Sequence, residues 1–345
     1  MTTVLEALNC ALLAAMDADE NVILLGEDIL DPYGGAFKVT RGCSEAHPDR
    51  VILTPISEAG LAGIASGMAL RGLRPVLEIM FGDFTTLLAD QIINHMTKFR
   101  WMYNDSVDLP LVIRTPMGGR RGYGPTHSQS LEKLYLGVPG LTVLAPVSLA
   151  ILPAGRDGPG PLLQQAILGT NSPVLFIENK LQYLQTVSGL SDLSEFDVRV
   201  EFSADDTAKL YPIYRLTIKG APEPKITLAA YGAMADLTRE AVIRLAYEKE
   251  IFSELVLPTR LAPFRLEGIL DSVGHTGALL TVEEGTRTLG WGAEVLARVS
   301  EIPGIGLKRS ARIAAQDLPV PASPVLEASV LPQVDTIIEQ VQKMV

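Results

Sequence analysis

Hydrophobic positions along the chain follow two alternating patterns. Short runs rich in β-branched residues, such as 22–25 and 51–53, predict buried strands. Longer segments with apolar residues at helical spacing predict helices, and the first of these lies close to the N-terminus. This alternation is typical of a mostly parallel sheet with helices on both faces. The same patterns predict further strands at 76–80, 111–114, 142–145, 174–177, 226–231, 255–257 and 279–282, and helices at 58–70, 85–103, 130–136, 234–249, 289–299 and 331–345.

The patterning weakens between residues 185 and 224, where polar residues are more frequent. We therefore expect an α/β protein with two doubly wound domains, 1–184 and 225–345, joined by a linker at 185–224 that contains some irregular strand. A chain of 345 residues is long enough for two sizeable cores. The segment 153–161, rich in glycine and proline, interrupts a helical pattern, so we expect a surface loop there, with an active-site flap as the alternative.

Composition narrows the class of protein. The formal net charge is −11 and basic runs are absent, which argues against nucleic acid and anionic membranes as partners. No apolar stretch approaches the length of a membrane span, and no basic segment precedes an apolar one at the N-terminus. We therefore expect a cytoplasmic protein. The two cysteines and four histidines have no metal-ligand spacing, so no metal site is expected in this chain.

The most informative candidate for chemistry is Glu58. It lies between the predicted strand 51–53 and a helix of small residues, and therefore at the carboxyl end of a strand, where open α/β sheets bind ligands. Few groups near it in the sequence can pair with its charge, and such a carboxyl is suited to exchange protons near neutral pH. The alternative is that Glu58, which follows Ser57, is an ordinary acid of a helix first turn.

Two further segments carry candidate site residues. Phe84 follows the strand 76–80, where an aromatic ring can offer a flat face to a ligand, although core packing would explain it equally well. His127 follows a loop that contains glycines and a proline and precedes a predicted helix. A histidine placed in this way is a candidate acid or base, and the alternative is an exposed histidine in a capping loop.

Nine short motifs, taken together and in order, match those of a known protein family, although no one of them is specific by itself. They are 26–28 (Gly-Glu-Asp), 33–37 (Tyr-Gly-Gly-Ala-Phe), 55–60 (Pro-Ile-Ser-Glu-Ala-Gly), 90–94 (Asp-Gln-Ile-Ile-Asn), 127–129 (His-Ser-Gln), 139–141 (Pro-Gly-Leu), 178–180 (Glu-Asn-Lys), 283–285 (Glu-Glu-Gly) and 319–321 (Pro-Val-Pro). Because these motifs occur in this order, the chain resembles the beta subunit of the thiamine-diphosphate-dependent, decarboxylating component of the 2-oxoacid dehydrogenase complexes. That transketolase-like family includes pyruvate, branched-chain 2-oxoacid and acetoin dehydrogenases.

The resemblance implies roles for residues at matching positions. Glu58 matches the glutamate that hydrogen-bonds N1′ of the cofactor's aminopyrimidine and thereby favours its reactive tautomer. Phe84 matches the aromatic residue against the pyrimidine, and Ile56 and Met80 match its apolar surroundings. His127 matches an active-site histidine near the substrate and the incoming lipoyl group.

Two acids, Glu27 and Asp90, match residues that the family places near a buried channel between its two active sites. The resemblance therefore makes both of them proton-relay candidates.

The same resemblance implies partners. The family's motif for Mg²⁺ and diphosphate, Gly-Asp-Gly followed later by Asn, does not occur in the sequence. Thiamine diphosphate would therefore be shared with an alpha subunit, which would bind Mg²⁺ and the diphosphate, in an α₂β₂ heterotetramer. A lipoyl-bearing acyltransferase would be a further partner. The chain departs from the family pattern at 153–161, 218–220 and 254–260, and these differences argue against docking to an acyltransferase core.

We therefore expect an enzyme subunit that decarboxylates a 2-oxoacid and passes the acyl unit to a lipoyl acceptor. Two alternatives stay open: a carboligase subunit of specialised metabolism, with the same chemistry and another acceptor, and a non-catalytic scaffold subunit. The joint presence of Glu58, Phe84 and His127 argues against the scaffold. No Gly-x-Gly-x-x-Gly follows 22–25, which argues against a nicotinamide-dependent enzyme.

Overall fold

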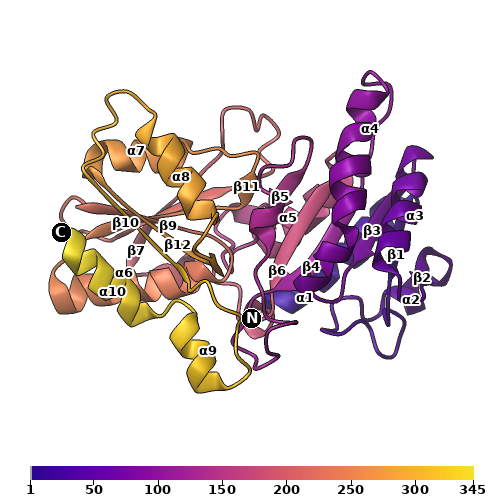
Figure 1. The fold of residues 1–345 in the computed structure, drawn as a ribbon, viewed down its shortest axis with the longest axis horizontal. Helices are drawn as coiled ribbons and strands as arrows, with labels where there is room; N and C mark the ends of the chain where they lie inside the picture. Colours follow the sequence, from indigo (N-terminus) through magenta and orange to yellow (C-terminus); the bar gives the residue numbers. More distant parts are fainter. Residues whose placement is uncertain (1) are drawn as a thin grey trace.

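The computed structural model describes residues 2–345 and contains two β-sheets covered by helices (Figure 1). Within that range, the first sheet has seven strands in the order β11-β5-β6-β4-β3-β1-β2. All neighbours are parallel except β11, which comes from the second half of the chain and pairs antiparallel with β5. The strands are β1 Val22–Gly26, β2 Val51–Leu53, β3 Arg74–Glu78, β4 Val112–Met117, β5 Thr142–Leu144, β6 Val174–Asn179 and β11 Arg260–Ala262.

The second sheet has six strands over the same described range, in the order β13-β12-β9-β10-β8-β7. Its strands β9, β10, β12 and β13 are parallel, and β8 and β7 form an antiparallel hairpin at one edge. We call the first sheet with its helices the N-terminal unit, and the second the C-terminal unit. The strands of the second sheet are β7 Phe196–Glu201, β8 Ile213–Ile218, β9 Ile226–Ala230, β10 Ser253–Pro258, β12 Ala278–Thr286 and β13 Arg309–Ala315.

Strands β7 and β8 lie in the segment 185–224, which we expected to be a linker with irregular strand. The segment is therefore part of the second sheet, with β7 at its edge. The polar residues that weakened the pattern have a physical explanation: Phe196 is buried in β7, whereas Asp197 and Arg199 point to solvent. An antiparallel edge strand with one solvated face has this alternation.

The helices begin and end close to their predicted limits in several places. The predicted helices 58–70 and 234–249 coincide with α3 and α6, whereas the predicted helix 85–103 is a 3-10 turn at Gly82–Leu88, a π-helical segment at Gln91–Met96 and then the short α4. The predicted helix 130–136 is only the 3-10 turn Glu132–Leu134. The α-helices are α1 Val4–Ala18, α2 Cys43–Ala46, α3 Glu58–Leu70, α4 Thr97–Met102, α5 Pro159–Leu168, α6 Met234–Lys249, α7 Glu267–Thr276, α8 Trp291–Ser300, α9 Pro324–Val330 and α10 Val334–Met344.

Local sequence explains how α1 begins. The Thr3 hydroxyl accepts a hydrogen bond from Glu6 N at 3.2 Å, and the Glu6 carboxylate accepts one from Thr3 N at 2.8 Å. This capping box satisfies two backbone donors at the start of the helix. Residues Leu8 and Leu12 then face the core, as the helical spacing predicts.

The two units share a hydrophobic core cluster. It contains Ile113 and Val143 of the first sheet together with Val256, Leu279 and Trp291 of the C-terminal unit. In Figure 1 the N-terminal unit, indigo to magenta, lies directly beside the C-terminal unit, orange to yellow. Burial of apolar side chains from both units therefore joins them.

The parallel strands of the N-terminal unit bring their following loops to the same edge of the sheet. Glu27 follows β1, Phe81 and Phe84 follow β3, and His127 lies in the loop after β4. This edge is where ligands bind in open α/β sheets. Among residues 2–345, none of the helices combines the length and the apolar character that a membrane crossing needs.

Candidate active site

Glu58 is the first residue of α3 and is largely buried. Its exposed fraction is only 9%, whereas that of Ile56, two residues earlier, is 82%. The Ser57 side chain forms no capping hydrogen bond, and within residues 2–345 the Glu58 carboxyl has no hydrogen-bond or ion-pair partner. The helix-start position agrees with the alternative of a first-turn acid, but burial without a partner is not needed for that role.

The carboxyl of Glu27 lies close to that of Glu58. Burial raises the pKa of Glu27, the negative charge of Glu58 raises it further, and a hydrogen bond from the backbone of Ser57 opposes both. One carboxyl oxygen of Glu27, Oε1, is buried and has no partner in the part of the chain that the structure describes. Two neighbouring carboxyls in such an environment are suited to share and transfer a proton.

Phe84 and His127 meet in an aromatic cluster. Their ring centroids are 5.3 Å apart with an interplanar angle of 77°, and the ring of Phe81 lies against both, 5.8 Å from Phe84 and 4.6 Å from His127. Edge-to-face arrangements at these distances are favourable. His127 Nδ1 is 2.9 Å from the hydroxyl of Thr126, a contact that orients the ring.

The loops that carry these residues are anchored by a buried ion pair. Arg114 of β4 donates from Nε to Glu178 at 2.8 Å and from Nη1 to Glu78, so its guanidinium ties the middle of β4 to the ends of β3 and β6. Tyr183 donates a further hydrogen bond to Glu178 at 2.6 Å. Burial lowers the pKa of Arg114, but the two carboxylates outweigh that effect and its pKa is raised.

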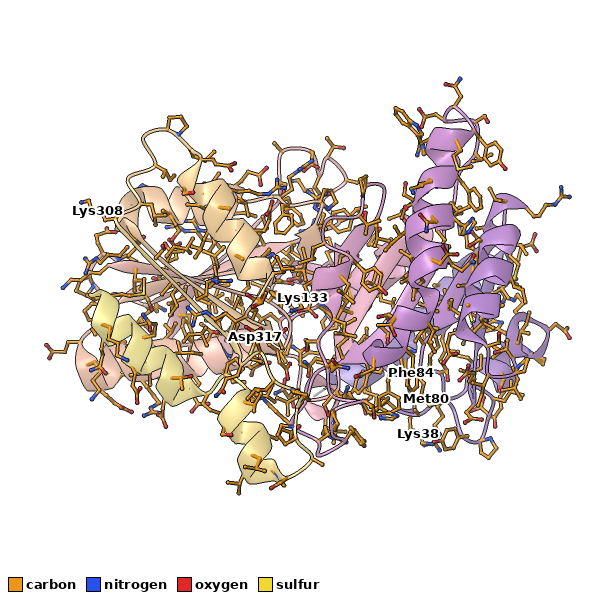
Figure 2. All side chains as sticks on the ribbon, in the orientation of Figure 1. Lys38, Met80, Phe84, Lys133, Lys308 and Asp317 are labelled. Carbon is orange, nitrogen blue, oxygen red and sulfur yellow. The ribbon has the colours of Figure 1, made fainter. Side chains whose placement is uncertain are left out.

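The remaining predicted residues lie apart from these pairs. Met80 is half-buried two residues after β3, and Figure 2 labels Met80 and Phe84 at the same end of the N-terminal unit. Asp90 is exposed; its carboxylate accepts a hydrogen bond from Asn94 at 2.8 Å and lies 3.4 Å from His95 Nε2. The structure therefore brings together Glu27 with Glu58 and Phe84 with His127, and places Asp90 among partners of its own.

Two residues that the sequence analysis did not single out also belong to this region. Phe81 is the centre of the aromatic cluster, and its position next to Met80 was the available signal. Lys180, directly after β6, is fully buried with its Nζ 5.5 Å from the centroid of the Phe81 ring. Burial lowers the pKa of Lys180 to about 8, although nearby acids oppose the shift. A lysine immediately after an apolar strand was the signal for it.

Comparisons with known proteins agree with this geometry. Residues 1–185 match the family model of the transketolase pyrimidine binding domain, and residues 217–337 match that of the transketolase C-terminal domain. A solved structure described as "Split gene transketolase, inactive beta4 tetramer" superimposes with a TM-score of 0.72 at 20% identity, over 99% of this chain and 98% of that chain. The protein is therefore of the transketolase class, and the expected α/β fold is confirmed.

Relatives identify the family within that class. The mitochondrial pyruvate dehydrogenase E1 component subunit beta of Caenorhabditis elegans is 35% identical over 344 residues, which cover 99% of this chain and 92% of the relative. The corresponding protein of Mus musculus is 36% identical over 344 residues, covering 99% and 90%. The chain therefore belongs to the beta-subunit family of the thiamine-diphosphate-dependent 2-oxoacid dehydrogenases, as the motifs indicated.

These relatives also correct one expectation. Both are named as mitochondrial proteins, so the predicted cytoplasmic location is wrong. Net charge, cysteine usage and the pattern near the N-terminus do not distinguish one reducing compartment from another, which is why the sequence did not reveal this.

Proposed function

We propose that this chain supplies the pyrimidine side of a thiamine diphosphate site that an alpha subunit completes. The observation that carries the proposal is the largely buried Glu58, whose carboxyl has no protein partner within residues 2–345 and lies beside Glu27, at the edge of the sheet where ligands bind. The Gly-Asp-Gly motif for Mg²⁺ and diphosphate is missing from the sequence, so we assign both groups to the alpha subunit of an α₂β₂ heterotetramer.

The residues present fit the aminopyrimidine half of this cofactor. The Glu58 carboxyl has no protein partner within residues 2–345 and is free to hydrogen-bond a ring nitrogen, and Ile56, two residues earlier, is an apolar residue that is 82% exposed. Phe84 is only partly buried, and its contacts with His127 and Phe81 are T-shaped rather than stacked. Ile56, Met80 and Phe84 would hold the ring, and Glu58 would hydrogen-bond it.

The chain's own residues would then move protons and exclude water. Thiamine diphosphate, when bound, supplies the electron sink for loss of CO₂ from a 2-oxoacid. Glu58 would hold a proton at its carboxyl, and Glu27 would exchange it, since the two carboxyls interact. His127 would act as acid or base at Nε2 in the transfer of the acyl unit. We keep Asp90 as a relay candidate because partner chains in a heterotetramer would cover its exposed carboxylate.

The names of the relatives suggest the substrate and acceptor to test first. They are pyruvate dehydrogenase subunits, so we propose pyruvate as the first 2-oxoacid and the lipoyl group of an acyltransferase as the acceptor.

Substitution of Glu58 tests the proposal. We expect Glu58→Gln, reconstituted with the alpha subunit, to lose about 10²-fold or more of its decarboxylation rate with an artificial electron acceptor, because an amide does not exchange a proton as a carboxyl does. The matched control is Glu267→Gln, since Glu267 is the exposed first residue of α7, as Glu58 is the first residue of α3. Equal, small effects of the two substitutions would show that Glu58 is only a first-turn acid.

A further inference from the structure

The loop that carries His127 is held by the C-terminal unit. We call residues 118–130 the His127 loop. Glu284, near the end of β12, reaches into its first turn: one carboxylate oxygen accepts a hydrogen bond from the backbone N–H of Gly119 at 2.9 Å. The other oxygen accepts one from the Asn179 amide at 2.7 Å. Glu284 is 7% exposed, so both bonds are sheltered from water.

A second carboxylate of the C-terminal unit binds the next residue of the loop. Glu327 in α9 is 4% exposed and accepts a hydrogen bond from the backbone N–H of Arg120 at 2.7 Å. Arg120 has a φ of +67° and Gly118 one of +90°, so the turn is left-handed on both sides of Gly119. A side chain at position 120 tolerates that conformation only where its surroundings fix it. The guanidinium of Arg120 also donates to the carbonyl oxygen of Pro332.

Lys180 lies buried in the same region, and its Nζ has no hydrogen-bond partner within residues 2–345. Glu284 and Asp83, with Glu327, act on the buried ammonium of Lys180 as opposite charges. The ammonium lies over the ring of Phe81, whose edge-to-face contact with His127 is 4.6 Å between centroids. The direct contacts of the C-terminal unit with the His127 loop are therefore the hydrogen bonds at Gly119 and Arg120.

We propose that Glu284 and Glu327 are positioning residues, through which the C-terminal unit sets the place of His127 for acyl transfer. The inference rests on the proposed function of His127 but not on that of Glu58. Neither carboxylate lies in the Glu58 region or in the aromatic cluster, and their bonds go to backbone N–H groups of the loop.

The hydrogen bonds of Asn179 allow a sharp test. Its Oδ1 already accepts from Leu181 N at 2.8 Å, so its amide cannot flip to become an acceptor toward position 284. In Glu284→Gln the new amide oxygen can accept from Gly119 or from Asn179, and its NH₂ group then faces a donor. Asn179→Asp in the same chain provides an acceptor for that NH₂ group and is expected to rescue the variant. Glu327→Gln keeps one acceptor oxygen for Arg120 and is expected to have the smaller effect.

The first measurement is hydrogen exchange by mass spectrometry on the reconstituted complex without cofactor or substrate. We expect faster exchange of peptides from the His127 loop in Glu284→Gln and recovery in the double variant. The control is Glu283→Gln, a buried neighbour on the same strand whose carboxylate accepts from Gly292 of α8 and not from the loop. Unchanged exchange in Glu284→Gln, or an equal increase in the control, would overturn the proposal, whether or not the complex has thiamine-dependent activity.

The second measurement times CO₂ release and acyl transfer separately in the holoenzyme. Displacement of a catalytic group by about 1 Å can cost on the order of 10²-fold in rate, so we expect transfer to slow at least about tenfold in Glu284→Gln while CO₂ release changes much less. Rescue by the added Asn179→Asp substitution would support positioning. Equal slowing of both steps with a lower melting temperature would make Glu284 a stability residue and overturn the proposal.

Discussion

The buried acid Glu283 gives a quantitative prediction about stability. It belongs to β12, and its completely buried side chain meets the start of α8, where Oε1 accepts from Gly292 N at 3.0 Å and Oε2 has no partner within residues 2–345. Burial raises the pKa of Glu283 from 4.5 to about 8, and the nearby Glu132 raises it, while backbone N–H groups of α8 oppose the shift. We expect Glu283→Gln to mimic the protonated carboxyl in both shape and charge.

The sign and size of the effect follow from the two pKa values. Because the folded state binds the Glu283 proton more tightly, its contribution to stability is present below the ordinary value of 4.5 and is lost as the pH rises through about 8. Each pKa unit corresponds to about 1.4 kcal/mol. The free energy of unfolding of Glu283→Gln, relative to the unmodified chain, should therefore rise by about 4 kcal/mol between about pH 5 and about pH 9.

Urea unfolding of the full chain at several pH values, followed by circular dichroism, measures this difference. The difference in the free energy of unfolding between the variant and the unmodified chain cancels the contributions of the other groups that titrate in the same pH range. Glu301→Gln, at an exposed acid just after α8, is the control and should show a difference that does not depend on pH. A flat pH profile for Glu283→Gln would mean that the carboxyl is ionised throughout, and would refute the reasoning from burial.

Three further predictions concern the cofactor, His127 and the anchoring ion pair. The isolated chain should bind thiamine diphosphate weakly or not at all by calorimetry, and micromolar Mg²⁺-dependent binding without an alpha subunit would contradict a shared site. His127→Ala should slow acyl transfer more than CO₂ release in pre-steady-state assays, and equal slowing of both would assign His127 to substrate binding. Arg114→Met should lower the free energy of unfolding by about 3–5 kcal/mol in urea titrations, because it leaves the carboxylates of Glu78 and Glu178 buried without their partner; a loss below about 1 kcal/mol would show that the pair is not needed.

Local chemistry in the sequence determined much of the fold. The helices 58–70 and 234–249 were predicted at their observed limits because small and apolar residues at helical spacing leave few alternatives. The strands that precede Glu58 and Phe84 were also identified, since short β-branched runs in an alternating chain predict parallel strands. The order of motifs then placed the chain in its family, which the relatives confirm.

The tertiary structure determined which residues distant in the sequence contact one another. The sequence could not show that Phe81 contacts both Phe84 and His127, or that the buried Lys180 lies over the Phe81 ring, because these contacts join loops that are brought together only by parallel strands. It also did not show that Glu284 holds the His127 loop across the boundary between the two units. The segment 185–224 was expected to be a linker because its pattern is polar, whereas it contributes β7 and β8 to the second sheet. Exposure at a sheet edge depends on which strands pair, and the sequence does not show this. The spacing of hydrophobic residues along the chain indicates whether a segment is a helix or a strand. The position of a charged side chain in a buried site depends instead on packing between elements that are distant in the sequence.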